Sequence, residues 1–223
     1  MLYSIDNVKS NIRNRGGKRV FYLGKEDALT PSARDWLRGE RVEILSAEQA
    51  KPTEYRLENG GFFREKPEHY THLRGDVLVP KTHPVIAFRG AVDSLQAQLL
   101  LAQGTVPGAM QPKVGEILEL TRNLIRWDVM QEPARFTTLL GLTAQQLREH
   151  SHFPQKYYGV AHFMPEYTDG EAILRLNMAR CAARYAELTA VHAFKEERAD
   201  LLQVLNRISS AIYILMLQLK KER

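Results

Sequence analysis

Polar side chains recur at helical spacing in three otherwise apolar stretches of the chain. One set steps by three, four and three positions: Asn177, Arg180, Arg184 and Glu187. A second set near the C-terminus shares one narrow helical face: Gln203, Asn206, Arg207, Ser210 and Tyr213. The third set is a pair that holds the only charges between Val85 and Gln103: Arg89 and Asp93. Because burying a charge is costly without a neutralising partner, we expect these three polar stripes to face one another.

Facing stripes would form a polar cavity with positive charge left over. Their arginines outnumber the carboxylates of Asp93 and Glu187. A polyphosphate would balance the surplus, because guanidinium groups match phosphate oxygens with paired hydrogen bonds. The alternative is that each stripe is the solvated face of an amphipathic helix. The low number of charges in residues 85–103 and 201–218 argues against this alternative.

The stripes lie on predicted helices. Apolar residues recur with helical periodicity over five stretches: 84–103, 111–131, 143–149, 171–195 and 197–219. Glycine and proline interrupt the pattern between these stretches, for example at Gly104 and Pro133. Helices joined by short or medium connections predict a bundle. We therefore expect a mainly α fold, a helical bundle of about five helices with a small α/β N-terminal region.

The N-terminal region has a different pattern. The stretch KRVFYL favours a strand, LTPSARDWLRGE favours a helix capped by Thr30 with Pro31 in its first turn, and RVEIL favours another strand. Residues 46–68 are polar and contain the turn signal Asn59-Gly60-Gly61. We expect a small α/β region at 1–70 and a helical-bundle domain at 71–223.

The positive charge of the chain is local. Of the net charge of +5, residues 1–20 contribute +4, because Asp6 opposes five basic residues: Lys9, Arg13, Arg15, Lys18 and Arg19. The rest is nearly neutral, which does not support a basic nucleic-acid surface over a whole domain. We interpret residues 1–20 as a basic, mobile arm.

Composition narrows the class of protein further. A hydrophobic share of 44% and a charged share of 26% are typical of globular proteins. The single cysteine, Cys181, excludes an intramolecular disulfide and a cysteine-cluster metal site, and we interpret it as a core residue. The histidines lack the spacing of a zinc site. We find no apolar leader and no apolar run long enough to span a membrane, and we expect a cytoplasmic protein.

Several short motifs together resemble one known family. Over residues 71–219 the chain resembles the ATP:cob(I)alamin adenosyltransferases, most closely the ethanolamine-utilization type. The motifs occur in the same order and spacing: THL at 71–73, KTHP at 81–84, FRGAVDS at 88–94, SHFP at 151–154, HFMPEY at 162–167 and VLNRISS at 204–210. The stretch LNMARCAARYAE at 176–187 is similar to a helix of the propanediol-utilization type that carries an Arg-x-x-x-Arg-x-x-Glu pattern.

The resemblance implies a helical-bundle enzyme that forms homo-oligomers with sites between neighbouring subunits. In this family cobalt(I) of cobalamin attacks the 5′ carbon of ATP and expels triphosphate, so the protein places its substrates and stabilises charge. The implied cofactors are ATP, cobalamin and Mg²⁺. The implied partners are a flavoprotein reductase and a coenzyme B12-dependent lyase, and the implied location is the cytoplasm, in association with a metabolosome compartment.

The resemblance also implies residue roles. Asp93 would pair with Arg180, Arg184 would bind triphosphate and Glu187 would orient it, which makes Asp93, Arg180 and Arg184 the expected catalytic group. Asn206 would contact ATP.

Lys81 and Arg89 would add to the ATP site. His162 aligns with an aromatic residue that excludes the lower cobalt ligand, so we expect His162 and its neighbour Phe163 to contact cobalamin. Arg207 fits either phosphate binding or a subunit contact.

The chain also departs from the family pattern. The Thr-Gly-Asp phosphate loop of the propanediol-utilization type is absent, Ser210 stands where that type has an aspartate, and the cysteine-rich metal motif of some ethanolamine-utilization members is missing. We therefore expect no protein-bound metal site, with Mg²⁺ arriving on ATP.

Two other functions fit the sequence. The first is a non-catalytic cobalamin or nucleotide carrier that supplies a coenzyme B12-dependent lyase. The second is a regulatory protein whose basic N-terminal arm contacts nucleic acid, which would show as salt-dependent DNA binding.

Overall fold

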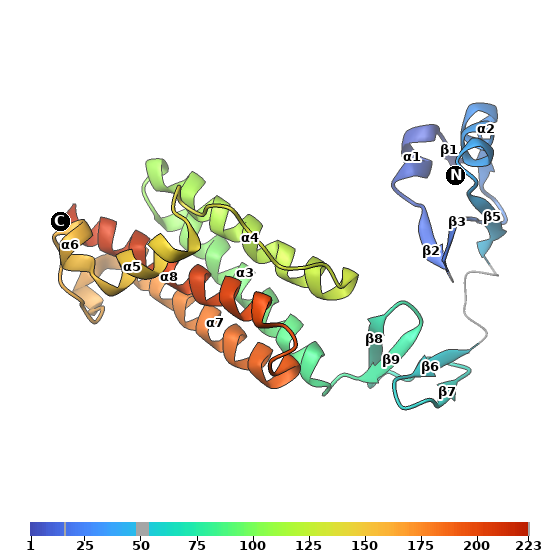
Figure 1. Ribbon diagram of the computed structural model, residues 1–223. Coiled ribbons are helices and arrows are strands. Elements are labelled where there is room, and N and C mark those ends of the chain that lie inside the picture. The colour runs from blue at the N-terminus through green and yellow to red at the C-terminus, as the bar shows by residue number, and fades with distance from the viewer. Residues whose placement is uncertain (16, 48–53, 223) are drawn as a thin grey trace. The chain divides into compact units, whose positions relative to one another are not determined.

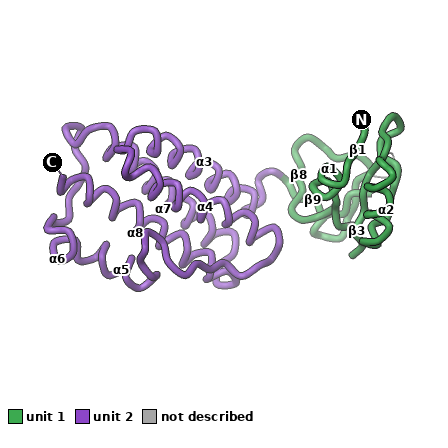
Figure 2. The backbone as a smooth tube through the Cα atoms, turned by 90° about the horizontal axis from the view of Figure 1, so that it is seen from above, with its two compact units in different colours: residues 1–80 green, residues 81–223 purple. Residues whose placement is uncertain are grey.

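The computed structural model describes residues 1–15, 17–47 and 54–222, and its contacts divide the chain into two units (Figure 2). Unit 1 spans residues 1–80 and unit 2 spans residues 81–223. The division follows Pro80, not residue 70 as expected, because the strands β8 (Tyr70–Arg74) and β9 (Val77–Pro80) pair with each other within a sheet of unit 1.

Unit 2 is a bundle built on four long helices: α3 (Pro84–Thr105), α4 (Gln111–Met130), α7 (Gly170–Phe194) and α8 (Ala199–Lys221) (Figure 1). Two shorter helices and two 3-10 turns connect them: α5 (Ala144–His152), α6 (Pro154–Tyr158), η2 (Gly108–Met110) and η3 (Tyr167–Asp169). Each of the five predicted helices is present, and the prediction of a mainly α bundle is confirmed.

Local sequence signals set where these helices begin and end. Pro84 opens α3 behind His83, whose Nδ1 accepts a hydrogen bond from the Val85 N–H at 3.2 Å. Thr143 and Gln146 form a capping box at the start of α5. These caps satisfy backbone donors that the first turn of a helix leaves without partners.

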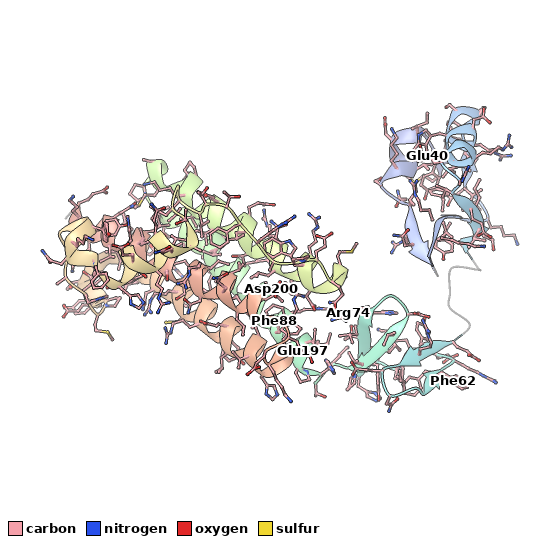
Figure 3. The ribbon with its side chains drawn as sticks, viewed as in Figure 1. Glu40, Phe62, Arg74, Phe88, Glu197 and Asp200 are labelled. Carbon is pink, nitrogen blue, oxygen red and sulfur yellow. The ribbon has the colours of Figure 1, made fainter. Side chains whose placement is uncertain are left out.

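Small side chains let α3 and α7 pack closely. The face of α7 that is fully buried carries alanines at helical spacing: Ala179, Ala183, Ala186 and Ala190. The Phe88 and Phe194 rings meet edge to face at 5.2 Å between centroids, so the start of α3 contacts the end of α7. The two helices therefore run antiparallel, with Phe88 inside the bundle (Figure 3).

Among the four long helices of unit 2, α8 has the most buried side chains. Most of its side chains from Leu201 to Leu219 are buried against α7, α4 and α5. By length and composition, α3 and α8 could each span a membrane, which contradicts our expectation that no segment reaches that length and hydropathy. Burial accounts for the apolar character of α8, since 61% of its apolar window is inside the bundle.

The start of α8 is fixed by an ion pair. Arg198 donates to Asp200 at 3.0 Å and to the Glu132 carbonyl at 3.0 Å, and Asp200 also accepts from the Ala134 N–H at 2.7 Å. Burial by itself raises the pKa of Asp200, but the hydrogen bonds from Arg198 and Ala134 outweigh it and hold the pKa below its ordinary value. This lowered pKa makes the stability of unit 2 sensitive to acid.

We expect the Asp200 contribution to be present above the carboxyl's unfolded-state pKa and to disappear as the pH falls through the lower folded-state pKa. The Asp200→Asn variant should therefore unfold at lower urea concentration than wild type at pH 7 and lose less stability on acidification to about pH 3. The control is Glu119→Gln, whose carboxylate is exposed. Parallel pH profiles for wild type and Asp200→Asn would show that the ion pair adds no pH-dependent stability.

The N-terminal twenty residues of unit 1 are folded, so our interpretation of a mobile basic arm is wrong for residues 1–15 and 17–20. They form β1 (Leu2–Tyr3), α1 (Ile5–Lys9), β2 (Arg13–Arg15) and the start of β3 (Lys18–Leu23). Val8 is fully buried in a cluster of unit 1 with Phe21 and Leu37. Residue 16 lies outside the described residues.

The predicted strand-helix-strand of unit 1 is confirmed. The strand β3 pairs in parallel with β5 (Glu43–Ser46), and α2 (Pro31–Gly39) connects them with β4 (Ala28–Leu29) before it. Thr30 caps α2 as predicted, because its side chain accepts from the Ala33 N–H. The strand β2 adds to β3 in antiparallel fashion, and β1 pairs with β4.

A four-stranded sheet with the order β7-β6-β9-β8 completes unit 1. The strands β6 (Tyr55–Leu57) and β7 (Phe62–Phe63) form a hairpin around the predicted turn, where Gly60 has φ of 90°. A positive φ of this kind favours glycine. The expected polar stretch at 46–68 thus contains two strands, and residues 48–53 of it lie outside the described residues.

Candidate functional site

A cavity of about 590 Å³ lies in unit 2 between α7, α8 and the segment 151–164. Two of the three polar stripes meet there. Its lining consists of Ser151, His152, His162, Phe163, Met164, Arg180, Arg184, Asn206, Ser209, Ser210 and Tyr213. The ribbons of α7 and α8, orange and red, run side by side in Figure 1. The cavity therefore has a cationic wall from α7 and a ring-lined wall from residues 162–163 and Tyr213.

The cationic wall is formed by two arginines one turn apart on α7. The Arg180 guanidinium is held by Asn177, whose Oδ1 accepts from Nε at 3.2 Å and from Nη2 at 3.0 Å. Arg184 is exposed at the cavity. Within residues 1–15, 17–47 and 54–222, neither arginine forms an ion pair with a carboxylate. Unneutralised guanidinium groups in a cavity are suited to an anionic ligand.

Three hydrogen-bonded side chains, those of Glu187, Asn206 and Arg207, border the same wall. Asn206 donates from Nδ2 to the Glu187 carboxylate at 3.0 Å, and its Oδ1 accepts from Arg207 Nη1 at 3.0 Å. Asn206 lines the cavity, whereas Glu187 and Arg207 stand behind it. Two residues that the family resemblance assigns to ATP, Glu187 and Asn206, are thus brought into contact.

Positive charge accumulates around these three hydrogen-bonded side chains. Burial lowers the pKa of Arg207, repulsion from Arg148 on α5 lowers it further, and Glu187 partly opposes both effects. The Nε atom of Arg207 is buried and has no hydrogen-bond partner within the described residues. The cavity therefore borders more guanidinium groups than nearby carboxylates can neutralise.

The opposite wall comes from the segment between α6 and η3. His162 and Phe163 lie against Tyr213 of α8, with ring centroids 5.9 Å and 6.1 Å from its ring. The Lys220 ammonium lies 5.4 Å from the centroid of the Phe163 ring and also pairs with the buried Asp169. The two residues expected to contact cobalamin are thus packed against α8 at the cavity.

The polar stripe of α3 does not reach this cavity. Arg89 instead donates from Nε to Asp128 Oδ2 of α4 at 2.8 Å, and its Nη2 lies 2.6 Å from the same oxygen. The Asp128 side chain is 0% exposed and that of Arg89 is 15% exposed. The structure therefore gives Arg89 a carboxylate partner inside the bundle and does not place it with the other residues expected at the ATP site.

Asp93 and Lys81 also lie away from the cavity lining. Both are exposed, Asp93 on α3 and Lys81 just before that helix. At about 1.5 Å per residue, Asp93 lies about 8 Å along α3 from the Phe88–Phe194 contact, whereas Arg180 lies about 21 Å along α7 from the same contact. Within the described chain no ion pair joins Asp93 to Arg180, so their pairing stays a prediction that needs a second copy of the chain.

Sequence reasoning missed several residues of the site. Ser209, which is not part of the predicted polar stripe of α8, lines the cavity with Ser151, His152 and Met164. The signal for Ser151 and His152 was present in the SHFP motif. Asp128 was missed as a partner of Arg89, although it is the acidic residue in the apolar stretch LIRWDVM. Cys181 is exposed on α7, so its interpretation as a core residue is wrong.

Metal-ligating side chains are dispersed in the structure. Among the described residues, no group of three or more histidine, cysteine, aspartate or glutamate side chains could hold a metal ion. His162 has both ring nitrogens within hydrogen-bonding distance of Tyr213 and His152.

Comparisons with known proteins agree with this geometry. The family model described as "Cobalamin adenosyltransferase" matches residues 62–219. The corrinoid adenosyltransferase EutT of Salmonella typhimurium is 34% identical over 158 residues, which are 69% of this chain and 59% of that protein. EutT of Escherichia coli K12 is 32% identical over the same length. The match thus spans less than two thirds of these curated relatives.

Two solved structures share the fold. They are variants of a PduO-type ATP:corrinoid adenosyltransferase from Lactobacillus reuteri complexed with cobalamin and ATP, in which one phenylalanine is replaced by alanine or by histidine. Their TM-scores are 0.51 and 0.52 at 16% identity, and the alignments cover 79% and 80% of this chain and 92% and 91% of theirs. At this identity the likeness is one of fold.

The family assignment rests on the sequence match, and it agrees with the order of the motifs and with the helical fold. The match covers both walls of the cavity, from the segment around His162 to the α7 arginines and the α8 stripe. This chain belongs to the cobalamin adenosyltransferase family.

Proposed function

We propose that this protein transfers the 5′-deoxyadenosyl group of ATP to cob(I)alamin, giving adenosylcobalamin and triphosphate. The observation that carries the proposal is the cavity itself, where Arg180 and Arg184 line one side and His162 and Phe163 line the other. The first side suits the polyphosphate of a nucleotide, and the second suits the flat face of a corrin ring.

The proposed reaction needs no nucleophile from the protein. The electron pair of cobalt(I) forms the new bond to the 5′ carbon of ATP, and the bond from that carbon to the triphosphate oxygen breaks. The electron pair of the broken bond leaves with triphosphate, so negative charge develops on the leaving oxygen. Arg184 and the N–H groups of Arg180 that Asn177 does not engage would stabilise that charge.

Mg²⁺ fits this arrangement as a companion of ATP. Magnesium is held by one or two carboxylates together with phosphate oxygens and water. Glu187 is the carboxylate next to the cavity, and its contact with Asn206 directs it toward the wall that carries the arginines. We assign Glu187 to orienting Mg²⁺-bound triphosphate and Asn206 to contacting the nucleotide.

We further propose that the protein acts as a homo-oligomer. Large apolar side chains about half exposed share the packed pair α3 and α7: Leu100, Leu101, Met178, Tyr185, Leu188 and Val191. Large exposed apolar side chains on two packed helices are typical of subunit interfaces. Asp93 is exposed on α3 and Arg184 is exposed on α7, the same two helices that carry these apolar side chains. A second copy that packs on these helices would therefore bring its own side chains close to the open cavity.

The pairing of Asp93 with Arg180 across such an interface gives a testable outcome. We expect Asp93→Arg and Arg180→Asp each to shift the protein toward monomer, because each places like charges together. The double variant, with the two charges exchanged, should recover the mass of the wild-type assembly. Light scattering after size exclusion measures the mass. A double variant as dissociated as the worse single variant would argue against the pair.

The reaction also requires reduced corrinoid. We propose that a flavoprotein reductase supplies the electron and that a coenzyme B12-dependent lyase uses the product. We propose a cytoplasmic location in association with a metabolosome compartment. The exposed Cys181 is consistent with a reducing compartment.

A direct assay separates this enzyme from a non-catalytic carrier. Purified protein is mixed with MgATP and chemically reduced cobalamin, and adenosylcobalamin is followed by its absorbance while triphosphate is measured by ion chromatography. The proposal predicts equal amounts of both products over many turnovers. Binding of either substrate without product would favour the carrier. Salt-dependent binding of DNA by the purified protein would favour the nucleic-acid alternative.

A further inference from the structure

Tyr213 is the α8 side chain that contacts both walls of the cavity. Its hydroxyl lies 3.1 Å from His162 Nδ1 and accepts from the Phe163 N–H at 3.4 Å. Its ring is stacked with those of His162 and Phe163, at interplanar angles of 11° and 25°. The Arg180 guanidinium carbon lies 6.0 Å from the centroid of the same ring.

The hydrogen-bond network fixes the proton positions around His162. Its Nε2 lies 3.2 Å from the His152 carbonyl oxygen, which can only accept, so Nε2 carries the proton and donates. In neutral imidazole, Nδ1 is then the acceptor, and the Tyr213 hydroxyl donates to it. The Phe163 N–H donates in turn to the Tyr213 oxygen. Both nitrogens of His162 are therefore engaged.

The engaged Nδ1 has a chemical consequence. A neutral imidazole nitrogen with a free electron pair is a common metal ligand. Cobalt is the reacting atom of the proposed function, and a histidine ligand would compete for its coordination. The Tyr213 hydroxyl occupies the electron pair of His162 Nδ1 and holds the ring against the cavity wall.

We propose that Tyr213 is the positioning residue of the corrin side of the cavity: its hydroxyl orders His162 and Phe163 and keeps the imidazole from binding cobalt. This inference rests on the proposed function for the identity of the ligand. The ordering of the segment by the hydroxyl can be measured without any substrate. Tyr213 acts through His162 and Phe163, so its effect is on the corrinoid and not on ATP.

The test uses a matched pair of tyrosine-to-phenylalanine variants. Tyr213→Phe removes the hydroxyl and keeps the ring that packs on α8. Tyr158→Phe removes another tyrosine hydroxyl that bonds a histidine Nδ1, that of His150 at 2.9 Å, outside the cavity lining. Burial raises the pKa of Tyr158 to about 12, so its hydroxyl is protonated at neutral pH. Equal melting temperatures would show that both variants fold.

The first measurement is nitrogen NMR of the histidine side chains without substrate. We expect the Nδ1 resonance of His162 to shift in Tyr213→Phe and to stay in place in Tyr158→Phe, where the His150 resonance shifts instead. An unchanged His162 resonance in Tyr213→Phe would overturn the proposal, whatever the protein's activity. A shifted resonance in a protein that makes no adenosylcobalamin would leave the ordering role standing and refute the proposed function.

The second measurement uses the substrates. We expect Tyr213→Phe to raise the KM for cob(I)alamin about tenfold, the cost of one hydrogen bond of about 1.4 kcal/mol, with the KM for ATP unchanged. Electron paramagnetic resonance of bound cob(II)inamide, which has no nitrogen base of its own, should show nitrogen coupling in Tyr213→Phe and none in wild type or Tyr158→Phe. Equal rises in both KM values, or nitrogen coupling already in wild type, would overturn the proposal.

Discussion

Replacing Arg184 with alanine lowers the rate of adenosylation by about 10²–10³-fold and leaves the helical content unchanged. A loss of this size is expected when one preorganised donor to developing negative charge is removed from an active site. The fold should tolerate the change because Arg184 is exposed at the cavity and forms no ion pair within the described residues. Steady-state kinetics gives the rate, and far-ultraviolet circular dichroism gives the helical content.

The matched control for this prediction is Arg175→Ala. Arg175 lies on the same helix but outside the cavity lining, where it pairs with Glu171 at 3.2 Å. Its loss should change the rate by less than about twofold, because an exposed pair of this kind adds little even to stability. A wild-type rate of adenosylation in the Arg184→Ala variant would show that Arg184 does not stabilise the triphosphate.

Removing the Arg89 side chain destabilises unit 2 by about 3–5 kcal/mol, because the buried Asp128 carboxylate loses the guanidinium that pairs with it. Asp128 is 0% exposed and receives Arg89 Nε at 2.8 Å, so water cannot replace the lost partner without opening the bundle. We expect Arg89→Ala to lower the urea concentration at the unfolding midpoint accordingly.

The control for the second prediction lies on α4. Arg122 pairs with Glu119 at 3.2 Å, but both side chains are more than half exposed. Arg122→Ala should therefore cost less than about 1 kcal/mol. The double variant Arg89→Met with Asp128→Leu should recover much of the stability lost in Arg89→Ala, because it replaces both charges of the buried pair with apolar side chains. An Arg89→Ala protein as stable as Arg122→Ala would contradict a structural role for the buried pair.

Helical periodicity predicted most of unit 2. Proline and glycine mark both ends of α3 and α4 and the start of α7 in the sequence, and the apolar residues of each helix recur every three to four positions. This local signal is strong because each helix buries one face along its whole length. The strands of unit 1 are only two to six residues long, and such short segments carry a weak periodic signal.

The interpretation of residues 1–20 as an arm failed for an identifiable reason. Their basic side chains suggested that the segment is exposed to solvent. The apolar residues between them, however, contribute to a core whose other members are distant in sequence. Val8 packs in one cluster with Phe21, Ala33 and Leu37. Some of the charge is matched in the fold, since Arg19 pairs with Glu40 at 2.9 Å.

The α7 and α8 stripes were predicted to converge, and they do, because their spacing places each on one face of a long helix. The α3 stripe does not converge with the other two stripes at the cavity. Arg89 and Asp93 are one turn apart, but the partner of Arg89 is Asp128, 39 residues along the chain and on another helix. Helical spacing tells which residues share a face, whereas the neighbour of that face depends on how the bundle packs.

The central claim is that the cavity between α7, α8 and residues 151–164 holds the triphosphate of ATP beside a corrin ring. The most direct measurement is an experimental structure of the protein with MgATP and cobalamin. The account predicts phosphate oxygens within about 2.7–3.2 Å of the Arg180 and Arg184 guanidinium groups and the corrin beside His162 and Phe163. Nucleotide bound elsewhere, with both arginines in contact with water alone, would contradict it.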